Sequence, residues 1–207
     1  FHRYYEGDKA ELERLFACCD IEIGCMLCAG SSMDEVKDIG NADLNLVIYP
    51  EYGAKTAEYL KERFGTAYYL CDGPPIGFKA VETMMREVCE ILHTSCDSFM
   101  EESRQARARA YVMISRLNSL TGLPKGVLYA VEGTYSQCYA YQKYLTGYFG
   151  MAADCLSIHD RDCDIWANKL KQQLEECRME RSLHKEITET RAELVFGTGN
   201  TIAVLKL

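Results

Sequence analysis

The sequence contains no apolar run that approaches the roughly 20 residues needed to cross a bilayer, although 48% of its 207 residues are hydrophobic. Basic residues are in the minority, because 23 Lys and Arg stand against 31 Asp and Glu, and the formal net charge is −8. Nucleic-acid binding depends on clustered positive charge. We therefore expect a soluble, cytoplasmic protein that contacts neither membrane nor nucleic acid.

Metal-ligand patterns are also sparse, although cysteine itself is abundant. The eleven Cys are scattered through predicted strands and helices, unlike the even, regularly spaced sets of disulfide frameworks. Cys25 and Cys28 have the spacing of a metal or redox motif, but no second such motif exists and the four His are distant in sequence. In a strand, a separation of three residues also sends the two side chains to opposite faces. We expect reduced thiols that act as small apolar residues, in a reducing setting such as that of an anaerobe, with a zinc site at Cys25 and Cys28 as the alternative.

What the sequence does contain is a strand–helix–strand unit between residues 44 and 71. Residues 44–49 form an apolar, β-branched run that is typical of a buried strand, and residues 67–71 form a second such run. Between them, apolar residues recur at helical spacing over 54–64, and Gly65 follows as a helix terminator. Parallel strands bring their carboxyl ends to one edge of a sheet, so the loops 49–53 and 71–77 are expected to lie together there.

The whole chain is predicted to be α/β, with two Rossmann-like parallel-sheet domains joined by a long helical stretch. The predicted domains are 1–76 and 121–207, the second truncated at its C-terminus, and residues 77–120 form the bridging helices. Strands are expected at 21–27, 44–49, 67–71, 126–131, 152–158 and 192–196. Charged residues between 175 and 189 predict an exposed helix or a mobile connector. The opening without Met and the end inside a helical pattern indicate a fragment of a longer polypeptide.

Three further motifs allow two interpretations each. Residues 197–200 could cradle a phosphate at a helix N-terminus, or could form a plain tight turn, because the third glycine and the acidic residue of a dinucleotide fingerprint are missing. His159 and Cys163 could form a nucleophile pair, or could belong to a capping loop with the neighbouring Asp160 and Asp162. The tyrosines of the helix predicted at 134–149 are expected to pack or to form an interface; they are Tyr135, Tyr139, Tyr141, Tyr144 and Tyr148.

Several segments together resemble the nitrogenase component 1 superfamily, in which the molybdenum-iron protein, its cofactor-assembly scaffolds and the dark-operative protochlorophyllide reductase are found. The matching segments are 29–40, 42–53, 57–65, 75–80, 125–133 and 192–200. The resemblance covers nearly the whole chain, and the order and spacing of the segments carry it. It implies a subunit of three Rossmann-like domains around a metallocluster site, of which this chain would supply the second and most of the third.

The resemblance also implies cofactors and partners. An iron-sulfur cluster or related metallocluster is expected in the full-length protein, but none in this fragment, which should be inactive alone. The expected partners are a paralogous subunit or a second copy, and an ATP-dependent iron-sulfur reductase that supplies electrons.

Position 49 indicates the substrate class. The family loop that holds the iron-molybdenum cofactor begins with a cysteine, and here that place is Tyr49, a harder and weaker ligand for an iron-sulfur cluster than a thiolate. The resemblance therefore favours an oxidoreductase for a substrate other than dinitrogen, such as a tetrapyrrole or a sulfur compound. The candidate cofactor-binding residues are Tyr49, Glu51, Gly133 and Tyr135. The alternatives are a scaffold for metallocluster assembly and a non-catalytic small-molecule-binding module.

Overall fold

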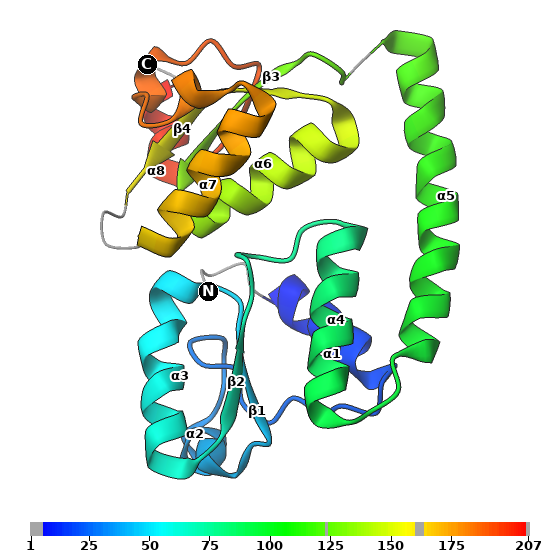
Figure 1. Ribbon diagram of the computed structural model, residues 1–207, viewed down its shortest axis with the longest axis vertical. Coiled ribbons are helices and arrows are strands. Elements are labelled where there is room, and N and C mark those ends of the chain that lie inside the picture. The colour runs from blue at the N-terminus through cyan, green and yellow to red at the C-terminus, as the bar shows by residue number, and fades with distance from the viewer. Residues whose placement is uncertain (1–5, 123, 160–163, 206–207) are drawn as a thin grey trace. The chain divides into compact units, whose positions relative to one another are not determined.

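The computed structural model describes residues 6–122, 124–159 and 164–205, and they divide into two compact units. Unit 1 comprises the described residues up to Val47, together with Gly53–Leu70 and Phe78–Arg109. Unit 2 comprises Ile48–Tyr52, Cys71–Gly77 and the described residues from Ala110 onward. Each unit contains a sheet whose strands are all parallel (Figure 1). The predicted α/β class is thereby confirmed.

In unit 1, β1 (Leu44–Val47) pairs in parallel with β2 (Ala67–Leu70), and α3 (Pro50–Phe64) is the crossover between them. Both predicted strands are confirmed. The helix begins at Pro50, earlier than the predicted residue 54. Proline suits the first helical position, because its ring fixes φ and no N–H is needed there. The predicted loop at 49–53 is therefore largely the first turn of α3, which corrects the expectation.

The strand predicted at 21–27 is wrong, and the described sheet of unit 1 has two strands. Here the backbone is satisfied locally: the Met26 N–H donates to Ser31 Oγ (2.8 Å), and the Ser31 hydroxyl donates back to the Met26 carbonyl oxygen (3.1 Å). Directly after this segment, Cys28 adopts a φ of 60° within a turn, a left-handed conformation that interrupts an extended backbone. The side chain of Ser31 thus makes the two hydrogen bonds with the Met26 backbone that a neighbouring strand would otherwise make.

The other helices of unit 1 are α1 (Glu6–Ala17), α2 (Met33–Lys37), the 3-10 turn η1 (Asp38–Asn41), α4 (Phe78–Leu92) and the first part of α5 (Asp97–Thr121). Ser32 and Glu35 form a capping box at the start of α2. Buried Glu82 on α4 accepts a hydrogen bond from Ser103 Oγ (2.7 Å) and pairs with Arg107, both on α5. A buried carboxylate with two partners ties the two helices together.

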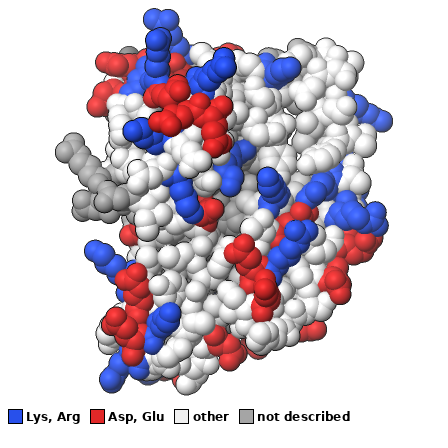
Figure 2. Space-filling model, in the orientation of Figure 1, with Lys and Arg blue, Asp and Glu red and all other residues white. Residues whose placement is uncertain are grey.

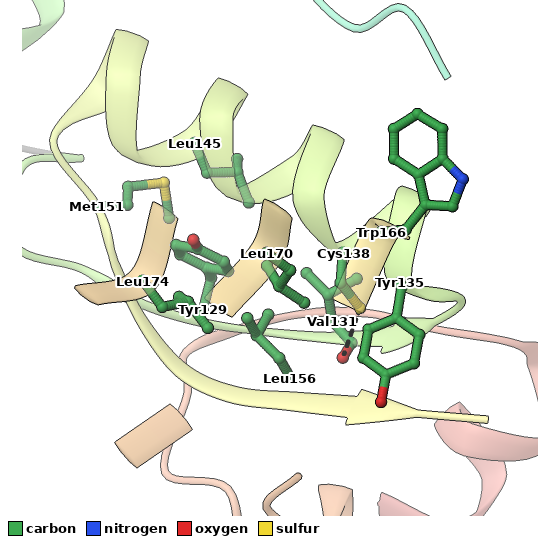
Figure 3. Close-up of a cluster of buried hydrophobic side chains, with 10 residues drawn as sticks. All are labelled: Tyr129, Val131, Tyr135, Cys138, Leu145, Met151, Leu156, Trp166, Leu170 and Leu174. Atoms are coloured by element: carbon green, nitrogen blue, oxygen red, sulfur yellow. Dashed lines mark hydrogen bonds between the residues drawn. The ribbon is translucent and has the colours of Figure 1, made fainter. Parts of the chain in front are cut away.

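In unit 2, the strand order is β4–β3–β5, with β3 at Leu128–Gly133, β4 at Ala152–Ile158 and β5 at Leu194–Phe196. The three strands predicted for this half are confirmed. The helices α6 (Tyr135–Phe149) and α7 (Asp164–Cys177) cover one face of the sheet. Their apolar side chains enclose Tyr129, Val131 and Leu156, as Figure 3 shows. Most of the tyrosines of α6 pack in or against this core, as predicted.

The opposite face of this sheet holds a smaller cluster of Ala130, Cys155 and Ile187. Ile187 belongs to the 3-10 turn η3 (Ile187–Glu189), which follows η2 (Glu180–Ser182), and the short helix α8 (Gly199–Leu205) ends the described chain. The segment predicted as an exposed helix or a mobile connector is thus a connector of two 3-10 turns. Burial raises the pKa of Asp154 on β4, but hydrogen bonds from Lys185, from the Arg191 N–H and from Thr190 outweigh it and lower that pKa to about 2.

None of the described helices combines the length and the apolar character that a membrane span requires. On the face drawn in Figure 2, positive and negative side chains are intermixed. Ion pairs also form within single helices, such as Arg104 with Glu101 at 2.7 Å on α5. Such exposed pairs each contribute little to stability.

Candidate functional site

The four predicted site residues, Tyr49, Glu51, Gly133 and Tyr135, all belong to unit 2. Gly133 is the last residue of β3, and Tyr135 is the first residue of α6. Tyr49 directly precedes α3, and Glu51 lies in its first turn. The candidate site is therefore made of two helix N-termini and the carboxyl end of a central parallel strand, the edge at which open α/β sheets bind ligands.

The N-terminus of α6 is closed by a capping box. Thr134 is the N-cap: its hydroxyl accepts from the Gln137 N–H (3.3 Å), and its own N–H donates to Gln137 Oε1 (2.9 Å). Gly133 makes this arrangement possible, because a Cβ at that position would lie 2.5 Å from Gln137 Oε1. The glycine predicted as a site residue thus leaves room for the Gln137 amide of the capping box.

Glu51 caps another backbone N–H at the N-terminus of α6, that of Ser136. Its Oε1 accepts from the Ser136 N–H (2.7 Å), and its Oε2 accepts from the Ser136 hydroxyl (2.6 Å). The Ser136 N–H is one of the N-terminal donors that have no partner within a helix. A carboxylate at that end also interacts favourably with the helix dipole. Glu51 therefore holds the first turn of α3 against the start of α6 with both oxygens.

The loop 71–77, which was predicted to lie at the same edge, also packs against α6. Gly73 has a φ of 87°, and a Cβ there would lie 2.2 Å from the Ser136 carbonyl oxygen. Gly77 lies against the ring of Tyr144. Asp72 pairs with Lys169 of α7 at 2.5 Å. Residues after β1 and residues after β2 thus meet the same helix at Ser136.

The two tyrosines have different surroundings. Tyr135 is buried at one end of the unit 2 core, and its hydroxyl points away from the other labelled side chains (Figure 3). Its ring makes an edge-on contact with His184, at 6.1 Å between centroids. Tyr49 is half-buried, and its ring lies 6.4 Å from that of Tyr52. The structure thus brings Glu51, Gly133 and Tyr135 together around the N-terminus of α6.

Sequence reasoning missed two groups at this edge. One is Ser136, the partner of Glu51. The other is the pair of His159 Nε2 and Glu132 Oε1, 3.2 Å apart; the second carboxylate oxygen of Glu132 is buried and has no hydrogen-bond partner among the described residues. The signal for this pair was available, because β3 and β4 are parallel and Gly133 lies opposite Ile158, so the residues that flank these positions are neighbours.

Comparison with known proteins identifies the family. The family model for nitrogenase component 1 type oxidoreductases matches residues 1–206. The chain belongs to this family. The resemblance seen in the sequence is thereby confirmed, since the match extends over almost the full length.

Curated relatives of this family member are subunits of one enzyme, the light-independent protochlorophyllide reductase. The matching subunit from Nostoc punctiforme is 34% identical over 93 residues, and the one from Porphyra purpurea is 37% identical over 93 residues. Each match covers 45% of this chain and 18% of the relative. A solved structure, "Nitrogenase Cp1 at pH 6.5", superposes with a TM-score of 0.73 at 17% identity, over 97% of this chain and 48% of that one. The chain thus spans about half the length of that nitrogenase chain, with the same fold.

The residues of this nitrogenase-like site do not fit an iron-sulfur cluster. Such clusters are held by cysteine thiolates, and the four candidate residues offer a carboxylate, two phenols and a glycine. Both oxygens of the carboxylate are already used. Burial raises the pKa of the Cys138 thiol of α6 above its usual range, and this thiol points to the Val131 carbonyl oxygen inside the core (Figure 3). These four residues therefore offer a ligand shape and hydrogen bonding, and no cluster ligands.

Two of the other sequence motifs lie wholly within the described part of the chain. At residues 197–200, the hydroxyls of Thr198 and Thr201 accept from each other's N–H groups (3.1 and 3.3 Å), as in a tight capping turn. The ten cysteines that the structure describes are free thiols; Cys25 is half-buried, and Cys28 is exposed. Of the motif that begins at His159, the residues Asp160, Asp162 and Cys163 lie outside the described part of the chain.

Proposed function

We propose that the chain forms part of a nitrogenase-like oxidoreductase subunit, which receives electrons from an ATP-dependent iron-sulfur reductase and reduces a substrate other than dinitrogen. One observation carries the proposal: within a chain of this family, Glu51 and Ser136 join the loop after β1 to the start of α6, beside the carboxyl end of β3. At the position of the cofactor cysteine, this loop carries Tyr49.

The curated relatives support an organic substrate. They are named as subunits of a light-independent protochlorophyllide reductase, and a tetrapyrrole is a flat, largely apolar molecule that aromatic side chains bind well. We assign Tyr49 and Tyr135 the role of contacting such a substrate through their rings or hydroxyls. Glu51 is a positioning residue that fixes the loop, and Gly133 leaves the room that the turn requires. A paralogous subunit or a second copy would complete the site.

The electrons for this reaction come from the reductase, and the protons come from solvent. The four site residues offer no thiolate ligand for a cluster, so the role that we assign to them is to bind and orient the substrate. Positioning of this kind is worth several kcal/mol of an activation barrier when the geometry is held tightly. We therefore expect loss of the Glu51 cap to lower the turnover number even where substrate still binds.

The test uses the natural protein that contains this sequence, assayed anaerobically with its own reductase and ATP. Glu51→Ala, which removes the cap, and Tyr135→Phe are expected to lower turnover at least about tenfold, which corresponds to about 1.4 kcal/mol of activation free energy. The matched controls on α3 are Glu58→Ala and Tyr59→Phe; both residues are exposed. Turnover that stays at the control level in both site variants, with normal circular dichroism, would overturn the assignment.

A further inference from the structure

A second group of chemically active side chains lies in unit 1 and has no part in the site described above. The sulfur atoms of Cys19, Cys89 and Cys96 all lie within 4.8 Å of one another. Cys19 follows α1, Cys89 is in the last turns of α4, and Cys96 directly precedes α5. Three thiols from three separate segments thus converge on one point, and all three residues belong to unit 1.

The surroundings of these thiols are those of an interior site. Cys19 and Cys89 are 3% and 2% exposed, and Cys96 is half-buried. The backbone around them is fixed by hydrogen bonds, from the Cys19 N–H to the Phe16 carbonyl oxygen (2.9 Å) and from the Thr94 N–H to the Cys89 carbonyl oxygen (2.9 Å). The three thiols are therefore positioned before any ligand arrives.

The spacing of the thiols matches one metal ion. Metal–sulfur bonds of about 2.3 Å place three sulfurs about 4 Å apart around a trigonal ion, within the limit observed here. An iron-sulfur cluster is usually held by four cysteines, with its ligands on different iron atoms, and three thiols this close together suit a single centre instead. Among the described residues, no fourth Cys, His, Asp or Glu joins the group.

We propose that Cys19, Cys89 and Cys96 form a three-coordinate binding site for a single soft cation, Cu(I). Thiolates are soft ligands that select Cu(I), zinc and iron-sulfur centres. Structural zinc sites are almost always four-coordinate, so a set of three thiolates favours Cu(I). Binding exchanges the thiol protons for the metal. Arg86 lies close enough to Cys96 to favour its thiolate form, and so offsets part of the negative charge that three thiolates and one monovalent cation create.

The alternative is that the three cysteines only pack in the core as small apolar residues. Burial, followed by hydrogen bonding to neighbouring thiols, raises the pKa of Cys19 to about 12. Burial also raises the pKa of Cys96, to about 11. Without a cation the group therefore consists of neutral thiols, which pack like small hydrophobic residues. Metal binding separates the two interpretations, since packing alone confers no affinity.

The experiment titrates the fully reduced 207-residue chain anaerobically with Cu(I), in competition with a colorimetric Cu(I) chelator. The test variant replaces Cys19, Cys89 and Cys96 with Ser, and the matched control replaces Cys25, Cys28 and Cys177 with Ser. We expect one tight equivalent in the wild type and the control, and its loss in the test variant. X-ray absorption at the copper edge should then give three sulfur neighbours.

A single substitution keeps the test decisive if the triple variant does not fold. Cys96→Ser changes the most exposed of the three thiols, and we expect it to weaken Cu(I) binding at least about tenfold while circular dichroism is unchanged. Tight binding that survives in both variants would overturn the proposal, and so would a wild type without a tight equivalent. Preference for Zn(II) with four ligands, or a disulfide within the group under reducing conditions, would also overturn it. None of these outcomes affects the turnover test of the Glu51 variant, so the two proposals can fail independently.

Discussion

Glu51 lies in the first turn of α3, and its carboxylate caps the N-terminus of a second helix, α6. Replacing it with Ala leaves the Ser136 N–H at the start of α6 without an acceptor, and the loss of a helix cap costs about 1–2 kcal/mol. Glu51→Gln keeps one carbonyl oxygen for that N–H, so we expect it to cost less than half as much. Urea denaturation of the two variants measures the difference. Equal losses for both would show that charge, and not the hydrogen bond, is what matters.

Asp154 links β4 to the segment that precedes β5. Its pKa is lowered to about 2 by its hydrogen-bond partners in spite of burial, so it stabilises the fold above its unfolded pKa and loses this contribution as the pH falls through about 4 to 2. We expect Asp154→Asn to lower the free energy of unfolding by about 2 kcal/mol at pH 7. The gap between variant and wild type should close towards pH 2. A gap that is constant with pH would contradict this account.

At the scale of single residues, the sequence indicated Glu51 and Gly133 as candidates, but it did not indicate the residue that Glu51 contacts. Glu51 and Gly133 were found because they lie next to the carboxyl ends of predicted strands. Ser136, 85 positions from Glu51, was not found, because nothing local distinguishes a serine that meets a carboxylate from one that caps its own helix. The proximity of the Cys19, Cys89 and Cys96 sulfur atoms could not be predicted from the sequence either, because it depends on how α1, α4 and α5 pack together.

The element that most depends on close packing is the loop 71–77. Gly73→Ala would bring a Cβ within 2.2 Å of the Ser136 carbonyl oxygen at a φ of 87°, so both backbone strain and a clash oppose it. Gly65→Ala is the matched control, because Gly65 has a φ of 80° but has open space around it. We expect about 1–2 kcal/mol for the control and at least about 2 kcal/mol more for Gly73→Ala. Thermal unfolding measures both, and equal losses would exclude a specific role for the contact with α6.

At the scale of elements, the sequence predicted the strands of both sheets except where local hydrogen bonds compete. The run at 21–27 has the composition of a strand, but Ser31 satisfies both backbone groups of Met26. Side-chain to backbone bonds of this kind compete with strand pairing. The early start of α3 has a different cause: Pro50 follows the apolar run of β1 directly, and proline suits the first position of a helix.

At the scale of the whole molecule, the segments Ile48–Tyr52 and Cys71–Gly77 can unfold either with unit 1 or with unit 2. The predicted boundaries at residues 76 and 120 assign Glu51 and Gly73 to the first domain, and these boundaries stay predictions. In the structure, Ile48–Tyr52 and Cys71–Gly77 belong with unit 2. Two core residues separate the two assignments: Met85 of unit 1 and Leu170 of unit 2 are both fully buried.

Replacing either core residue with Ala should cost about 2–5 kcal/mol, and segments that fold as one cooperative unit lose hydrogen-exchange protection together. We expect Leu170→Ala to reduce protection in β3, β4 and α6, and also at Glu51 and in the loop 71–77. Met85→Ala should reduce protection in α1 and α4 and leave that loop protected. If the loop instead follows Met85→Ala, the chain divides near residue 76, and the Glu51 cap of α6 is a contact that forms after each half has folded.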